Sequence, residues 1–141
     1  QIQIMMKQKT IKSNIDNSYD AFIWARRFPN DADYMKQHVV DGDDALRWAS
    51  GVGNKEDMAK LVTTGYQCIR WSNIFPEDCA LMQSKITTPK HAYEWMKDFG
   101  DVDYMLAIIG TDKTYQKLAN AWISKTKDKA QKILDLLSRV N

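Results

Sequence analysis

Cysteine and histidine are scarce in this sequence, with two residues of each among 141. Cys68 and Cys79 stand at apolar or small-residue positions, so we expect reduced, partly buried thiols and an intracellular, cytoplasmic protein. His38 and His91 lie far apart in the chain, and neither belongs to an HxxxH or CxxC pattern. Because a metal site needs three or four converging ligands, the sequence predicts no metal site and no bound cofactor.

Long apolar runs are also missing. None approaches the ~20 residues that a membrane-spanning helix needs, and we expect no membrane partner. Twenty basic residues against 18 acidic ones leave a formal net charge of +2, which is too little charge of one sign for a dedicated nucleic-acid binder. A hydrophobic content of 44% over 141 residues is enough for one globular domain with a real core.

The motifs of the common catalytic sites do not occur. The chain has no glycine-rich phosphate loop, no nucleophile elbow and no kinase signature. Asp41-Gly42-Asp43-Asp44 lacks the spacing of a calcium-binding loop, and a turn followed by a helix cap explains it better. The sequence therefore predicts no catalytic residue and no enzyme.

What the sequence does have is a repeat, marked by five tryptophans that are spaced 24, 23, 24 and 27 residues apart. A small residue stands three positions before each one, and a Met or Ile follows ten or eleven positions after it. A Val, Ile or Leu comes four positions later still. Five copies in register indicate an internal repeat. The four sets are Trp24, Trp48, Trp71, Trp95 and Trp122; Ala21, Ala45, Cys68, Ala92 and Ala119; Met35, Met58, Met82, Met105 and Ile133; and Val39, Val62, Ile86, Ile109 and Leu137.

Each repeat predicts two short helices. The small and apolar residues around the Trp cover one helical face, and the later pair, four residues apart, forms the apolar face of a second helix. A proline or glycine stops the first helix, and a polar residue then offers a cap for the second. The stops are Pro29, Gly53, Pro76 and Gly100, the caps include Asn54 and Asp101, and Thr88-Pro89 predicts the start of the fourth repeat.

We therefore predict an all-α fold, a solenoid-like stack of about five ~24-residue helix-turn-helix repeats. Residues 19–141 are expected to form a single helical-repeat domain, with residues 114–141 as its C-terminal capping unit. Residues 1–18 lie outside the repeat. Ile2, Ile4 and Met6 alternate with polar residues, so this leader is either a short edge strand or flexible.

The second repeat resembles an ankyrin repeat. Ala45-Leu46-x-x-Ala49 is similar to that family's first helix, and Gly53-Asn54-x-Glu56 is similar to its inter-helix turn. Lys60-Leu61-Val62-x-x-Gly65 is similar to the end of its second helix. Ankyrin repeats are ~33 residues long, so the chain resembles ankyrin-like repeats without the β-hairpin finger. The resemblance implies stacked helix pairs, and the extended face of such a stack is suited to binding.

The evenly spaced tryptophans allow two interpretations. They could form a platform that stacks bases or sugars, or they could pack in the core. Their spacing places each ring on the same helical face as alanine and phenylalanine, and large rings dominate small cores, so we favour the core.

The residue before each Trp lies opposite that face, which makes Arg47 and Arg70 candidate partner-binding residues. Stacked repeats would place them side by side, with Arg26, Arg27 and Lys97 at neighbouring exposed positions. One interpretation is that these side chains are scattered charges in contact with solvent. The other is a basic stripe that meets a carboxylate-rich or phosphate-bearing partner.

Together these patterns favour a small intracellular protein–protein interaction module, acting as an adaptor or an inhibitor of another protein, with no catalysis of its own. The alternative is nucleic-acid binding, or occlusion of a nucleic-acid-handling enzyme, through the basic stripe. Another protein is the expected partner. The sequence leaves open the identity of that partner and the oligomeric state.

Overall fold

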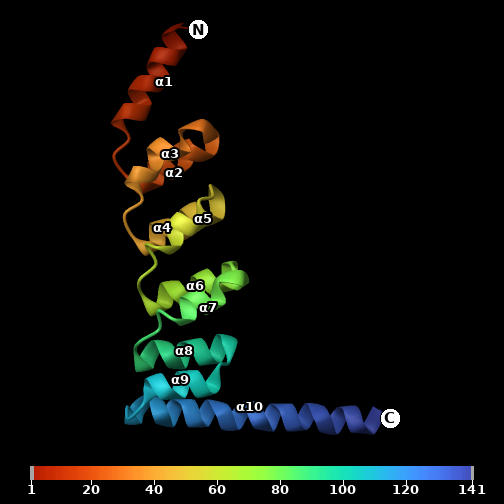
Figure 1. The fold of residues 1–141 in the computed structure, drawn as a ribbon. Helices are drawn as coiled ribbons and strands as arrows, with labels where there is room; N and C mark the ends of the chain where they lie inside the picture. The colour runs from red at the N-terminus through yellow and green to blue at the C-terminus, as the bar shows by residue number, and fades with distance from the viewer. Residues whose placement is uncertain (1, 141) are drawn as a thin grey trace. The chain divides into compact units, whose positions relative to one another are not determined.

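All regular secondary structure is helical in the computed structural model, which describes residues 2–140 (Figure 1). The all-α class predicted from the repeat is therefore confirmed for this part of the chain. The α-helices are α1 (Ile2–Asn14), α2 (Ser18–Arg27), α3 (Ala32–Met35), α4 (Gly42–Gly51), α5 (Lys55–Ala59), α6 (Gly65–Ile74), α7 (Cys79–Gln83), α8 (Pro89–Phe99), α9 (Val102–Ile109) and α10 (Lys113–Val140). Short 3-10 helices are η1 (Pro29–Asp31), η2 (Lys36–His38) and η3 (Pro76–Asp78).

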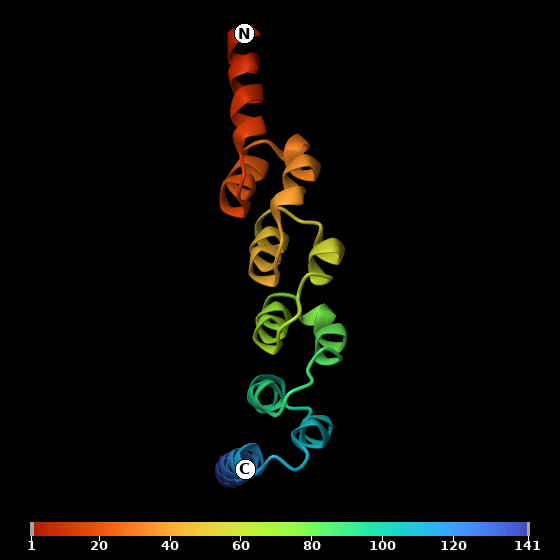
Figure 2. The same cartoon turned by 90° about the vertical axis from the view of Figure 1, so that its left-hand side faces the viewer.

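The helices group into two compact units, one that ends at Asp78 and one that begins at Cys79. In the first unit α2 contacts α3 and α4, and α4 also contacts α5 and α6. Figure 2 shows α2, α4 and α6 nearly end-on in one row, with α3 and α5 in a second row. In the second unit α8 packs on α9, and both contact α10. The single domain expected over residues 19–141 stays a prediction.

The repeat positions predicted to face the core are buried in the first four copies, with the exception of Trp24. All five small residues are fully buried or nearly so, as are three of the tryptophans, and Trp24 and Trp122 are half-buried. The core interpretation of the tryptophans is thus confirmed for the three middle repeats. The other buried repeat positions are Met35, Met58, Met82 and Met105, and Val39, Val62, Ile86 and Ile109.

Helix starts follow the local sequence closely. Asp41 caps α4, because its Oδ1 accepts a hydrogen bond of 2.9 Å from the backbone N–H of Asp44. Thr64 and Gln67 form a reciprocal capping box at the start of α6. Thr88 caps α8 directly before Pro89, so the start predicted for the fourth repeat is confirmed.

The turn inside two repeats uses left-handed backbone rather than a side-chain cap. Asn54 and Asp101 occupy the N-cap positions of α5 and α9, with φ of 56° and 51°, but neither side chain accepts a hydrogen bond from the helix that follows. Asp101 instead accepts a hydrogen bond of 3.0 Å from the indole of Trp95. Asn54 makes no such bond, and the buried indole N–H of Trp48 has no partner among the described residues.

The last repeat departs from the prediction. Residues 114–141 were expected to form a fifth helix pair, but residues 113–140 form the single helix α10. No proline or glycine occurs between Lys113 and Val140, so nothing stops the first helix and lets the chain fold back. As a result, Ile133 and Leu137 are exposed, although both occupy core positions of the repeat.

The leader is also helical. Residues 2–14 form α1, so the edge strand suggested by the alternation of Ile2, Ile4 and Met6 is wrong. No residue of α1 is buried, and its apolar side chains do not gather on one face. Its contact with the rest of the first unit is made mainly by polar side chains, above all Lys12.

Among the described residues, no helix is both long enough and apolar enough to cross a membrane. Cys68 is buried in α6 and Cys79 is half-buried at the start of α7, and neither forms a disulfide bond within the described residues.

Candidate functional site

Exposed arginines and tyrosines form a row along α2, α4 and α6 of the first unit. The guanidinium of Arg47 lies over the ring of Tyr19 from the preceding first helix, 5.5 Å from its centroid. The guanidinium of Arg70 lies 5.6 Å from the centroid of Tyr66, one turn earlier in its own helix. Arg70 also reaches back to Asp43 on α4, with Nη1 3.9 Å from Oδ1. We call Tyr19, Asp43, Arg47, Tyr66 and Arg70 the Arg–Tyr row.

Helical spacing explains why these residues gather. Tyr19, Asp43 and Tyr66 each stand five residues before a repeat Trp, and the arginines stand one residue before it. Positions four apart lie on the same helical face, here opposite the buried Trp. Since α4 contacts both α2 and α6, this face of one helix adjoins the same face of the next.

The contacts within the row are weak individually but they orient the arginines. Arg47 Nη2 is 4.0 Å from Asp44, and the pair of Arg70 with Asp43 is equally long and exposed, so each contributes little to stability. A cation over an aromatic face at an exposed site contributes about 0.5–1 kcal/mol. Each guanidinium therefore lies against a ring and still has N–H donors to offer a partner.

The other predicted site residues lie elsewhere. Arg26 and Arg27 are at the end of α2, over the rings of Phe22 and Phe28 at 5.6 and 5.0 Å. Lys97 belongs to the second unit, where its Nζ is 4.6 Å from the centroid of Tyr93. Of the five predicted residues, only Arg47 and Arg70 come together in the row.

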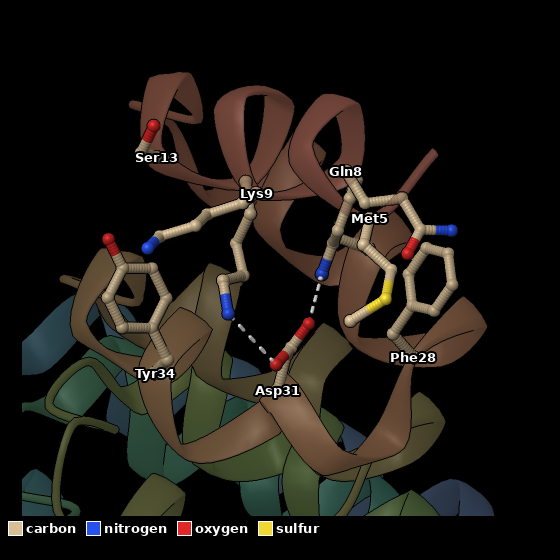
Figure 3. Close-up of a pocket in the computed structure, with 9 residues that line it drawn as sticks. Met5, Gln8, Lys9, Ser13, Phe28, Asp31 and Tyr34 are labelled. Atoms are coloured by element: carbon tan, nitrogen blue, oxygen red, sulfur yellow. Dashed lines mark hydrogen bonds and ion pairs between the residues drawn. The ribbon is translucent and has the colours of Figure 1, made fainter. Parts of the chain in front are cut away.

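A second feature is a pocket between α1 and the first helix pair, with a volume of about 500 Å³ (Figure 3). Asp31 lies at its base. One carboxylate oxygen accepts a 2.8 Å hydrogen bond from the indole of Trp24, and the other is 3.3 Å from Lys12 Nζ. The Lys12 ammonium also lies 5.4 Å from the centroid of Tyr34. Met5, Gln8, Lys9, Ser13 and Phe28 complete the lining.

These contacts set the charge state of Asp31. The hydrogen bond from Trp24 holds the pKa of Asp31 below its ordinary value. Partial burial opposes that shift, and the hydrogen bond and positive charge of Lys12 add to it. The carboxylate is thus ionised at neutral pH and engaged on both oxygens.

The hydrogen bond from Trp to Asp, with a lysine beside the carboxylate, occurs again 47 residues later. The contacts at the base of the pocket are therefore part of the repeated structure. Asp78 accepts a 2.8 Å hydrogen bond from Trp71, and Lys55 of α5 lies 3.5 Å from Asp78 and 5.2 Å from the ring of Phe75. Lys12 of α1 therefore contacts the first repeat as Lys55 contacts the third. In both cases the lysine comes from the helix that precedes the repeat.

Three members of the row, Tyr19, Asp43 and Tyr66, were not predicted as site residues. The contact between lysine, aspartate and tryptophan was not predicted either. The signals were present: Tyr19 and Tyr66 share one repeat position, and Asp31 and Asp78 each follow a Trp by seven residues. Among the described residues, no group of three or more His, Cys, Asp or Glu side chains is placed to hold a metal ion.

Comparison of the chain with protein-family models, with curated proteins and with solved structures finds no match.

Proposed function

We propose that the protein is a small protein–protein interaction module, acting in the cytoplasm as an adaptor or an inhibitor of another protein, with no catalysis of its own. Its ~24-residue helix pairs stack as a solenoid, resembling ankyrin-like repeats without the β-hairpin finger. The observation that carries the proposal is the Arg–Tyr row, in which two exposed arginines lie against tyrosine rings along the first helices of three consecutive repeats.

The composition of the row supports a protein partner. Arginine and tyrosine are among the residues that contribute most to the binding free energy at protein interfaces. Tyrosine offers a large apolar ring with a polar hydroxyl, and arginine offers a planar fork of donors for carboxylates. Holding the arginines against rings in the free protein reduces the entropy lost on binding.

The carboxylates beside the arginines favour a protein partner over nucleic acid. Asp43 and Asp44 lie within 4.0 Å of Arg70 and Arg47, respectively, so part of the positive charge is compensated. Phosphate binding depends on uncompensated positive charge, whereas a protein interface accepts a mixed pattern. A nucleic-acid partner is therefore the alternative that the experiment must distinguish.

The test reverses the charge of the two arginines in the row. Arg47→Glu with Arg70→Glu should change the free energy of unfolding by less than about 1 kcal/mol, because both side chains are exposed. The matched control is Lys60→Glu with Lys90→Glu, an equal charge change at exposed positions outside the row. Proteins captured from lysate would be identified, expressed and titrated against both variants. We expect affinity to fall more than tenfold for the row variant and less than threefold for the control.

Equal affinities of the two variants for every partner would refute the row as a binding site. Nuclease treatment and salt distinguish the class of partner. A nucleic-acid partner would be lost with nuclease, and its log affinity would fall with log salt by about 0.9 per neutralised phosphate of duplex DNA. A protein partner should survive nuclease and respond to salt mainly through its association rate.

A further inference from the structure

The second half of α10 has an apolar face that no other described element of the second unit covers. Within residues 124–140, five large aliphatic side chains are each more than half exposed to solvent. At 100° per residue they fall on one side of the helix, in an arc of roughly 160°. The five are Ile133, Leu134, Leu136, Leu137 and Val140.

This face, formed by residues 133–140, lies on the same side of α10 as the face that packs in its own unit, beyond a stretch (124–132) whose one apolar residue is Ala130. Eighteen residues make five full helical turns, so two residues 18 apart lie on one line along the helix. Leu137 therefore lies in line with Ala119, which is fully buried. Ile133 lies in line with Tyr115, whose ring is 6.1 Å from that of Tyr93 on α8.

The length of α10 explains why only its first half is covered. Its 28 residues span about 42 Å, whereas the 11 residues of α8 span about 17 Å. Figure 1 shows α10 running on beyond α8 and α9 within this unit. The uncovered face points to the side on which α8 and α9 lie.

That geometry bears on what can cover the face. A flat lipid surface laid on residues 124–140 would meet α8 and α9, which occupy the same side of the same helix. A helix or helix pair of another protein can lie beside α8 and α9 without such a clash. Helix-on-helix packing would simply extend along α10.

The charges beside the face define the chemistry of the partner. Residues 124–140 carry five cations against two carboxylates. Lys125 and Lys132 lie just outside one edge of the apolar arc, Lys129 lies just inside that edge, and Lys127 stands at the other edge. Asp128 and Asp135 lie on the far side of the helix. A second copy of the chain would bring like charges together, whereas a partner with carboxylates along its apolar face would pair with these lysines.

We propose that residues 124–140 dock an amphipathic helix of a partner protein whose apolar face is bordered by carboxylates, in line with α8 and α9. This inference rests on the proposed function only in taking the chain as a protein-binding module. It adds a second surface made of different residues from the Arg–Tyr row.

The experiment uses the full 141-residue chain and two fluorescent 18-residue peptides. Both carry leucines at helical spacing, and the leucine face is bordered by glutamates in one peptide and by lysines in the other. Fluorescence anisotropy should show at least tenfold tighter binding of the glutamate peptide. That difference should shrink as salt rises, since exposed charges are screened.

Two sets of variants locate the binding. Ile133→Ser with Leu137→Ser should weaken the glutamate peptide at least tenfold while leaving the fold intact, because both side chains are exposed. Lys129→Gln and Gln131→Glu change the net charge equally. Only the first should weaken binding appreciably, since Lys129 borders the face and Gln131 lies opposite it.

Several results would overturn the proposal. They are equal binding of the two peptides, no binding of either, and unchanged binding by the Ile133→Ser, Leu137→Ser variant. A dimer at micromolar concentration in sedimentation, lost in that variant, would assign the face to a second copy. Flotation of the folded chain with phosphatidylserine vesicles, lost in the same variant, would assign it to lipid. Arg47→Glu with Arg70→Glu should leave peptide binding intact, so failure of the row and failure of this face are distinguishable.

Discussion

The second and fifth repeats carry the same pattern of residues and fold differently. In the second, Met58 lies on α5, which folds back against α4, and Val62 follows that helix; they are 2% and 1% exposed. In the fifth, Ile133 and Leu137 hold the same positions and are 57% and 58% exposed. The difference lies at the turn, where Gly53-Asn54 interrupts the second repeat and Lys127-Asp128 continues the helix of the fifth. The spacing of apolar residues indicates which side chains can form a core. The residues at the turn determine whether the chain folds back and buries those side chains.

The largest expected contrast is between the two tryptophans. Trp48→Ala should lower the free energy of unfolding by about 3–5 kcal/mol, the range for a large aromatic removed from a core. Trp122→Ala should cost less than half as much, because Trp122 is only half-buried. Urea unfolding followed by circular dichroism measures both, and equal losses would contradict the comparison.

The next contrast tests the positions that follow the turn. Met58→Ala should cost about 2–5 kcal/mol, because it leaves a cavity in the core. Ile133→Ala should change the free energy of unfolding by less than about 0.5 kcal/mol, since the side chain is already in water. A loss above 1 kcal/mol for Ile133→Ala would show that its side chain is packed.

A third pair of substitutions introduces the turn residues of the second repeat into the fifth. Lys127→Gly with Asp128→Asn places the turn residues of Gly53 and Asn54 at the same distance from the Trp. A glycine in an exposed helix costs about 1 kcal/mol relative to alanine, so the helical circular dichroism signal should fall. If the chain then folds back, Ile133→Cys in this background should react with a thiol reagent more slowly than in the uninterrupted helix. An unchanged spectrum would show that these two residues do not set the difference.

The smallest effect concerns the carboxylate that follows the Trp. In the first repeat Asp31 stands seven residues after Trp24, and in the fifth Lys129 occupies that position. Because the folded pKa of Asp31 is lowered from 3.8, its contribution to stability is present above that pH and is lost as pH falls through the folded value. The difference in stability between the protein and Asp31→Asn should thus be larger at pH 7 than at pH 3. A difference independent of pH would contradict the ionised hydrogen-bonded state.

Local patterns in the sequence account for most of the helical fold. The repeat register predicted the buried positions of four copies, and Thr88-Pro89 predicted where α8 begins. The helix α1 was not predicted, because its apolar residues follow no helical period. The Trp–Asp bonds were also missed, since they join residues that are paired only once the turn is formed.

The candidate site was predictable only in part. Spacing alone placed Arg47 and Arg70 on the outer faces of their helices. The contact of Arg47 with Tyr19 and that of Arg70 with Asp43 each join two different helices. Such contacts depend on which helices pack together, and no single-helix pattern contains that information.

The exposure of the second half of α10 also affects how fast this part of the helix opens and closes. Within the second unit its backbone hydrogen bonds have no tertiary contacts to protect them, so they can open without unfolding of that unit. Helix–coil transitions of a segment this long take on the order of a microsecond. Amide hydrogens of residues 124–140 should therefore exchange with solvent much faster than those around the buried Ala119. A partner bound to this face would slow that exchange locally, so deuterium uptake along α10 would report its occupancy directly.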